Sequence, residues 1–186
     1  MRRNLTISAI CLLVAAAALY WLHLRSTRFD FTISQAAARN GVDFYLAKAL
    51  IYEESWFRQG SRGSAGEVGL MQITRAAAAD YAARTGFPEH SPEQLIEPDL
   101  NVEIGCWYLK NSLDHYKDSP HAVLFALLRY NAGESRANNW LQLASASPPP
   151  AGIAAEQYYL SFVDYPKTRT YVSRILKRYR SRNFLF

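Results

Sequence analysis

No charged residue lies between Arg3 and Arg25, and this apolar run constrains the fold of the chain more than any other feature. A helix of about 20 apolar residues, rising ~1.5 Å per residue, is long enough to cross a bilayer. Tyr20 and Trp21 lie near the end of the run, at the position where aromatic residues mark a membrane surface. We therefore expect residues 5–24 to form a membrane anchor.

A cleaved secretory signal peptide is the alternative interpretation of this segment. Ala15 and Ala17 are small enough for a cleavage site, but the bulky residues that follow them favour an anchor. The basic residues on its two sides leave the orientation open. Under either interpretation the rest of the chain is exported across the membrane. We therefore divide the chain into an anchor or signal segment, residues 1–28, and one domain, residues 29–186.

The formal net charge of +5 is unevenly distributed along the chain. Residues 1–28 carry four basic and no acidic residues, and residues 167–186 carry seven basic and none acidic. Residues 29–166 carry ten basic against sixteen acidic residues, so most of the domain is negative. This distribution excludes a generally basic nucleic-acid-binding surface, and we expect no nucleic-acid partner.

After residue 30, helical periods and caps recur, and strict apolar–polar alternation never runs for the length of a strand. Asp43 can cap a helix over residues 44–55, and Thr74 can cap one that ends at Thr85. Ser91 begins a capping-box pattern. Further helices are expected at residues 33–39, 99–116, 119–132, 134–143, 154–162 and 168–180. The predicted fold class is mainly α.

Four glycines recur every third residue between two of the predicted helices, at positions 60, 63, 66 and 69. Their spacing lacks the dinucleotide-binding pattern, and no phosphate-binding lysine motif follows. Such a loop lets the backbone approach a bulky ligand closely, or it simply turns tightly. The spacing alone leaves both interpretations open.

Glu54 precedes this loop and lies one helical turn after Leu50 and Ile51, at the end of an apolar stripe. Burial there would raise the pKa of the carboxyl group, as a general acid at neutral pH requires. Glu53 follows a similar stripe, so helix geometry prefers Glu54 only slightly. Two solvated glutamates at a helix end are the simplest alternative.

Five motifs occur in order over about residues 34–180. They are Glu54-Ser55-Trp56-Phe57, then Gly66-Glu67-Val68-Gly69-Leu70-Met71-Gln72-Ile73, then Leu95-Ile96-Glu97-Pro98-Asp99-Leu100-Asn101-Val102, then Tyr130-Asn131-Ala132-Gly133, and finally Thr168-Arg169-Thr170-Tyr171-Val172. Together they resemble the lytic transglycosylase family of the soluble (SLT) type. Several motifs in register are a far more specific signal than a lone Glu-Ser pair.

The resemblance implies a lysozyme-like, mainly helical domain behind an N-terminal hydrophobic helix. It also implies an enzyme that cuts the MurNAc–GlcNAc β-1,4 bond of peptidoglycan without water and leaves 1,6-anhydro-MurNAc ends. Glu54 would be the only catalytic carboxylate, first as acid and then as base. The enzyme would act in the periplasm on glycan strands, anchored to the inner membrane, with no cofactor and no metal.

The resemblance also assigns residues to the substrate groove: Gln72, Met71, Tyr130, Ser64, Asn131 and Tyr171. Tyr130 would hydrogen-bond Glu54, and the Met71 backbone and the Gln72 side chain would line the groove. Asn131 is expected to hold the local turn more than to touch sugar. Tyr171 and Trp56 are expected to stack on sugar faces.

Two positions depart from the family pattern. The family usually has serine where this chain has Gly63, so either the next residue, Ser64, replaces it through a shifted loop or the contact is absent. The last motif usually begins with glutamate, and here Lys167 stands in that place. A cation there would pair with a lactyl or peptide carboxylate of the substrate instead of accepting bonds from sugar hydroxyls.

Two other functions are considered beside this one. A hydrolase related to goose-type lysozyme would need a second carboxylate to hold water, and Glu67 and Glu134 are the loop carboxylates nearest the motifs. A non-catalytic peptidoglycan-binding or assembly protein would use the groove only to dock. The four histidines lack the pairing expected of metal ligands.

Overall fold

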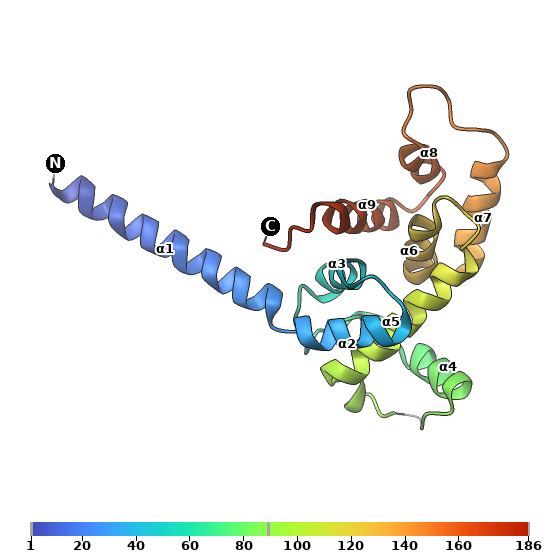
Figure 1. Ribbon diagram of the computed structural model, residues 1–186, viewed down its shortest axis with the longest axis horizontal. Helices are drawn as coiled ribbons and strands as arrows, with labels where there is room; N and C mark the ends of the chain where they lie inside the picture. Colours follow the sequence, from blue (N-terminus) through green and yellow to red (C-terminus); the bar gives the residue numbers. More distant parts are fainter. Residues whose placement is uncertain (1, 89, 186) are drawn as a thin grey trace.

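The computed structural model describes residues 2–88 and 90–185; the side chains of residues 2–6 and 9 lie outside that description. Over this part of the chain it has nine α-helices and one 3-10 turn (Figure 1). They are α1 (Arg2–Thr27), α2 (Asp30–Asn40), α3 (Phe44–Ser55), α4 (Arg75–Thr85), η1 (Gln94–Ile96), α5 (Pro98–His115), α6 (Ala122–Ala132), α7 (Glu134–Ser145), α8 (Ala155–Ser161) and α9 (Pro166–Ser181). The predicted mainly α class is confirmed.

The predicted caps form where the sequence placed them. The carboxylate of Asp43 accepts hydrogen bonds from the backbone N–H groups of Tyr45 and Leu46, at 2.8 and 3.1 Å, and so begins α3. The hydroxyl of Thr74 accepts one from Ala77 N–H at 3.0 Å and begins α4. α4 ends at Gly86, whose φ of 75° is left-handed.

The predicted helix after Ser91 is shorter than its capping box suggested. The box itself forms, because Ser91 N–H donates to Oε1 of Gln94 at 2.8 Å and Gln94 N–H donates to the Ser91 hydroxyl at 3.4 Å. Only one 3-10 turn follows, because Pro98 holds Glu97 in an extended conformation (ψ 127°) and then starts α5. The predicted start of α6 at residue 119 is also corrected, to Ala122.

α3 lies at the centre of the domain. Its residues Ala47, Leu50 and Ile51 are fully buried, and it packs against α2 and α9. α5 and α6 complete the core, α5 with the fully buried Ile104 and Leu109 and α6 with the fully buried Leu127 and Leu128. Burial of this central helix stabilises the segment that ends in Glu54.

The glycine-rich loop between α3 and α4 is held against α5 by Asn101, a fully buried polar side chain. Its Oδ1 accepts from Met71 N–H at 2.7 Å, and its amide donates to Val68 O at 2.9 Å and Leu95 O at 2.7 Å. Gly69 has a φ of 84°, and a Cβ there would overlap the Asn101 amide. Glycine is therefore needed at position 69 for both conformation and space.

α1 extends away from the other helices and meets them near α2 and the end of α3 (Figure 1). Its large apolar side chains from residue 7 onward are mostly exposed, among them Leu12 and Leu13 at 71%. By length and composition one candidate membrane span, Ile10–Asn40, occurs among the residues with described positions. The first residues of the predicted anchor, 5–24, include side chains outside the described part, and the division at residue 28 stays a prediction.

Candidate active site

Glu54 lies on the last turn of α3, where the helix stops without a glycine. Trp56 and Phe57 both adopt left-handed conformations, with φ of 52° and 57°. Side chains with a Cβ rarely adopt this conformation, so the strain must be offset by the surrounding packing. Phe57 is buried in the core at 4% exposure, and this burial fixes the direction in which the chain leaves Glu54.

The carboxyl group of Glu54 is in contact with the hydroxyl of Tyr171, which donates a 2.5 Å hydrogen bond to its Oε1 from α9. Burial raises the pKa of Glu54 to about 7, the nearby charges of Glu67 and Glu53 add to this increase, and the Tyr171 hydrogen bond opposes it. A pKa near 7 leaves a substantial protonated fraction at neutral pH. The direction agrees with the prediction made from the apolar stripe.

The predicted hydrogen bond between Tyr130 and Glu54 is wrong. The Tyr130 hydroxyl donates instead to the carbonyl oxygen of Met71, at 2.9 Å. The Glu54 charge still raises the pKa of Tyr130, after the larger effect of burial, so the two groups are neighbours. Tyr171, for which stacking on sugar was predicted, occupies the position against the carboxyl group.

Glu53, unlike Glu54, forms an ion pair. Its Oε1 pairs with the Arg174 guanidinium of α9 at 3.1 Å. Glu53 is therefore held in an ion pair with α9, whereas the adjacent Glu54 is the carboxyl group whose pKa is raised. The structure thus separates two glutamates that helix geometry barely distinguished.

Gln72 and Tyr130 line a hollow of about 350 Å³ beside this centre. Gln72 has a left-handed φ of 49°, and its side-chain amide donates to Gly69 O at 2.9 Å and Ser61 O at 3.3 Å. The amide N–H groups of Gln72 therefore hold the loop, and its Oε1 lies on the side of Gly63, 3.0 Å from where a Cβ at that position would stand. Met71 is fully buried, and its carbonyl is the acceptor for Tyr130.

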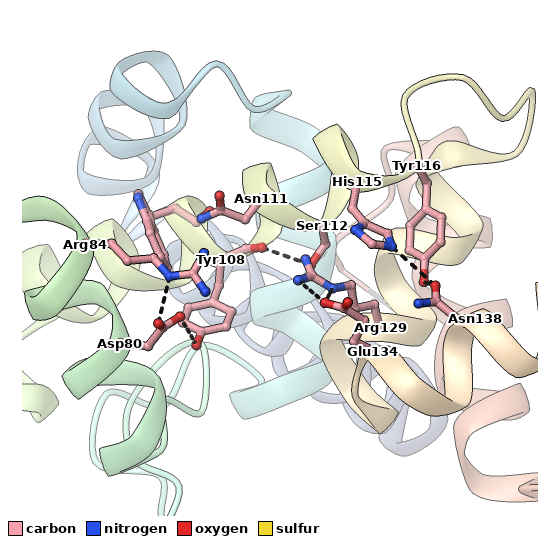
Figure 2. A network of polar contacts seen from close by, with 11 residues as sticks. Asp80, Arg84, Tyr108, Asn111, Ser112, His115, Tyr116, Arg129, Glu134 and Asn138 are labelled. Atoms are coloured by element: carbon pink, nitrogen blue, oxygen red, sulfur yellow. Dashed lines mark hydrogen bonds and ion pairs between the residues drawn. The ribbon is translucent and has the colours of Figure 1, made fainter.

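Tyr108, Ser112, Arg129 and Glu134 line this hollow and belong to the polar network drawn in Figure 2. Nε and Nη2 of Arg129 both donate to Oε2 of Glu134, at 3.0 and 2.6 Å, and Nη1 donates to the Ser112 hydroxyl at 3.2 Å. The Tyr108 hydroxyl donates to Oδ2 of Asp80 at 2.9 Å. These bonds fix α5, α6 and the start of α7 around the hollow.

Asn131 and Ser64, the remaining predicted groove residues, are not among the residues that line the hollow. Oδ1 of Asn131 accepts a 2.8 Å hydrogen bond from the Thr168 hydroxyl, so this side chain ties α6 to α9, whereas its predicted role is to hold the local turn. Ser64 is exposed on the glycine-rich loop. A Cβ at Gly63 would overlap Oε2 of Glu67, so the Glu67 side chain occupies the space that a larger residue at position 63 would take.

The Trp56 ring, for which stacking on sugar is predicted, has Arg25 over it and is 39% exposed, so the stacking stays a prediction. The guanidinium of Arg25, from α1, lies over the Trp56 ring and donates to the Trp56 carbonyl from Nε at 2.9 Å.

Lys167 lies beside Tyr171, Glu53 and Arg174 in a second hollow of about 320 Å³.

The roles of two residues in the site were not predicted from the sequence. Asn101 holds the loop that carries Met71, and an asparagine within an otherwise apolar helix stripe was the available signal. Glu67, considered from the sequence only as the second carboxylate of an alternative hydrolase, acts on Glu54 through its charge. Over residues 2–88 and 90–185, no three His, Cys, Asp or Glu side chains gather in a way that could hold a metal ion.

The fold and the site define a lysozyme-like helical domain built around a carboxylic acid of raised pKa. Residues 31–149 match the transglycosylase SLT domain, and the chain belongs to this family. It is 31% identical over 126 residues to the membrane-bound lytic murein transglycosylase F of Desulfosudis oleivorans, covering 66% of this chain and 26% of that protein. It is 29% identical over 161 residues to the soluble lytic murein transglycosylase of Salmonella typhimurium, covering 84% and 23%.

Solved structures agree with the family assignment. An inactive mutant of the lytic transglycosylase Slt from Pseudomonas aeruginosa superimposes with a TM-score of 0.70 at 25% identity, over 82% of this chain and 23% of that one. A 70-kDa soluble lytic transglycosylase in complex with bulgecin A shows the same fold, with a TM-score of 0.70 at 23% identity over 84% and 24%. The chain spans about a quarter of the length of these relatives.

Proposed function

We propose that this chain is a peptidoglycan lytic transglycosylase that cleaves the MurNAc–GlcNAc β-1,4 bond and leaves 1,6-anhydro-MurNAc ends. The observation that carries the proposal is the Glu54 carboxyl group, whose pKa is raised to about 7 and which receives the Tyr171 hydrogen bond. The names of the relatives support the same class of activity.

In the proposed reaction, protonated Glu54 gives its proton to the glycosidic oxygen as the bond from C1 of MurNAc breaks. The acetamido oxygen of the same sugar stabilises the positive C1. Glu54, now a carboxylate, takes the proton of the muramyl 6-hydroxyl, and O6 bonds to C1 to close the anhydro ring. One carboxyl group serves both steps, so no second carboxylate and no water are consumed.

Gln72, the Met71 backbone and Tyr130 are proposed to hold the glycan strand, because they line or adjoin the 350 Å³ hollow beside Glu54. Ser64 and Asn131 are proposed as weaker contacts from the two sides of the groove. Lys167 is proposed to pair with a lactyl or peptide carboxylate, since it lies with Tyr171 in the second hollow.

We also propose that α1 anchors the enzyme in the inner membrane, with the domain in the periplasm. The exposed apolar surface of α1 and the candidate span support this location. A membrane-bound relative from Desulfosudis oleivorans is consistent with it.

Digestion of purified sacculi tests the reaction. Mass spectrometry of the products from the wild-type chain is expected to show anhydro-muramyl ends, which Glu54→Gln should abolish and Glu53→Gln should largely retain. Reducing ends would indicate a hydrolase, in which Glu67 is the carboxylate to test next. Binding of sacculi without any cleavage would indicate a docking protein.

A further inference from the structure

The last turns of α1 and the turn after α3 enclose a pocket of about 680 Å³ that the proposed reaction does not use. We call it the juxtamembrane pocket; the lining residues that matter are Trp21, Leu24, Arg25, Arg28, Phe57 and Arg58. It combines apolar and aromatic side chains with three guanidinium groups. The lining that the structure describes contains no acidic residue.

The pocket is assembled by specific contacts. The Trp21 and Trp56 rings meet edge to face with centroids 6.4 Å apart, and Arg25 lies over the Trp56 ring. Nε of Arg25 also donates to the Trp56 carbonyl at 2.9 Å. These contacts hold the end of α1 against the turn at Trp56.

No acidic side chain among the described residues lines the pocket: Arg25 donates to the Trp56 carbonyl, and Nε of Arg58 donates to the Ser55 carbonyl at 3.3 Å. Arg25 and Arg58 lie close enough for their positive charges to repel one another, and Arg28 is exposed on the same lining. Like charges held together without an acidic partner favour an anionic ligand. A phosphate diester, with two unesterified oxygens, matches the donors that guanidinium groups present.

The position of the pocket along α1 identifies the source of that phosphate. If residues 5–24 cross the membrane, their ~20 residues span ~30 Å, the thickness of the hydrocarbon layer. Arg25 and Arg28 then lie at the level of the lipid headgroups, with Trp21 at the interface, where tryptophan is enriched. We propose that the juxtamembrane pocket binds the headgroup phosphate of an anionic phospholipid, an inference that rests on the proposed anchoring by α1.

This site would fix the catalytic domain relative to the membrane. The turn that lines the pocket begins two residues after Glu54, so a lipid bound there connects the membrane surface to the strained end of α3. The groove would thereby be held at a set height and orientation. The enzyme would then reach glycan close to the membrane in preference to distant layers.

The test uses the full chain in mixed micelles with equal amounts of phosphatidylglycerol and phosphatidylcholine, followed by native mass spectrometry of retained lipid. The wild-type chain is expected to retain phosphatidylglycerol preferentially. Arg58→Gln and Arg28→Gln are each expected to reduce that preference about fivefold, the effect of one basic side chain at an anionic membrane surface. Lys117→Gln removes the same charge from an exposed position beyond α5 and should leave it unchanged.

Three results would overturn the proposal: no preference in the wild-type chain, a preference that survives both arginine variants, or equal displacement of the lipid by soluble muropeptides. Thermal unfolding of each variant shows that it is folded. Alkaline extraction of membranes tests the anchoring separately. A chain that resists extraction but shows no lipid preference refutes the pocket alone, whereas a chain that is released refutes the anchoring and the pocket with it.

Discussion

The hydroxyl of Tyr171 donates to the carboxyl group of Glu54 across 117 positions of sequence, joining the beginning of α9 to the end of α3. A single phenol thereby restrains the group that we propose as acid and base. Because the bond favours the ionised carboxylate while burial disfavours it, the pKa of Glu54 reflects both effects. The hydrogen bond and the surroundings of the carboxyl group can be altered by separate substitutions.

Glu54→Gln should be more stable than the wild-type chain at alkaline pH. The pKa of Glu54 is raised from 4.5 to about 7 on folding, so the folded state binds the proton more tightly. The wild-type chain therefore loses stability as pH rises through that interval, by up to about 3 kcal/mol. Glutamine has no such proton, and its variant should show a higher Tm above pH 7 than the wild-type chain.

The difference in Tm between Glu54→Gln and the wild-type chain should shrink as the pH falls from about 7 to 4.5 and stay constant at lower pH, where Glu54 is protonated in both states. A difference that does not change with pH would contradict the raised pKa. Activity should fall by about a hundredfold or more, the usual contribution of a general acid.

Tyr171→Phe should move the alkaline limb of the pH profile of kcat/KM to higher pH. Removing the hydroxyl removes the bond that lowers the pKa of Glu54, so the acid form persists further into the alkaline range. The rate at the optimum should fall about tenfold, because the carboxyl group loses its orienting partner. Tyr165→Phe removes a hydroxyl from an exposed ring just before α9 and is the control.

Glu67→Gln should move the same limb in the opposite direction. The Glu67 charge raises the pKa of Glu54, so its removal lowers the pH at which the acid is lost. Asp118→Asn removes one negative charge at an exposed site and should leave the profile unchanged. If Glu67→Gln abolished cleavage at every pH, Glu67 would have a direct part in the chemistry that the proposed mechanism does not give it.

Asn101→Ala should lower the free energy of unfolding by about 3 kcal/mol, since three buried hydrogen bonds lose their partner. Hydrogen exchange should also accelerate at the Met71 amide, which donates to Asn101. Asn111→Ala, on the same helix, loses one bond to the Trp107 carbonyl and should cost much less. Equal losses in the two variants would show that Asn101 is not a special support of the loop.

Local signals in the sequence were sufficient for most of the helices. Caps such as Asp43 and Thr74 act within three residues, so their effect can be read without knowing the rest of the fold. The helix predicted after Ser91 failed because Pro98 overruled a capping box that does form. A capping box favours a helix, but a proline disfavours the helical conformation of the residue before it, and here the effect of the proline is the stronger.

The sequence by itself determined a helical chain with an apolar N-terminal segment, and it placed a carboxyl group at the end of an apolar stripe. Which hydroxyl meets that carboxyl group was decided only by tertiary structure, because Tyr130 and Tyr171 lie on helices whose packing brings both near Glu54. The same holds for Trp56, whose ring is covered by Arg25 of α1. Spacing along a chain fixes neighbours within a helix turn, whereas contacts between helices depend on how their buried faces pack.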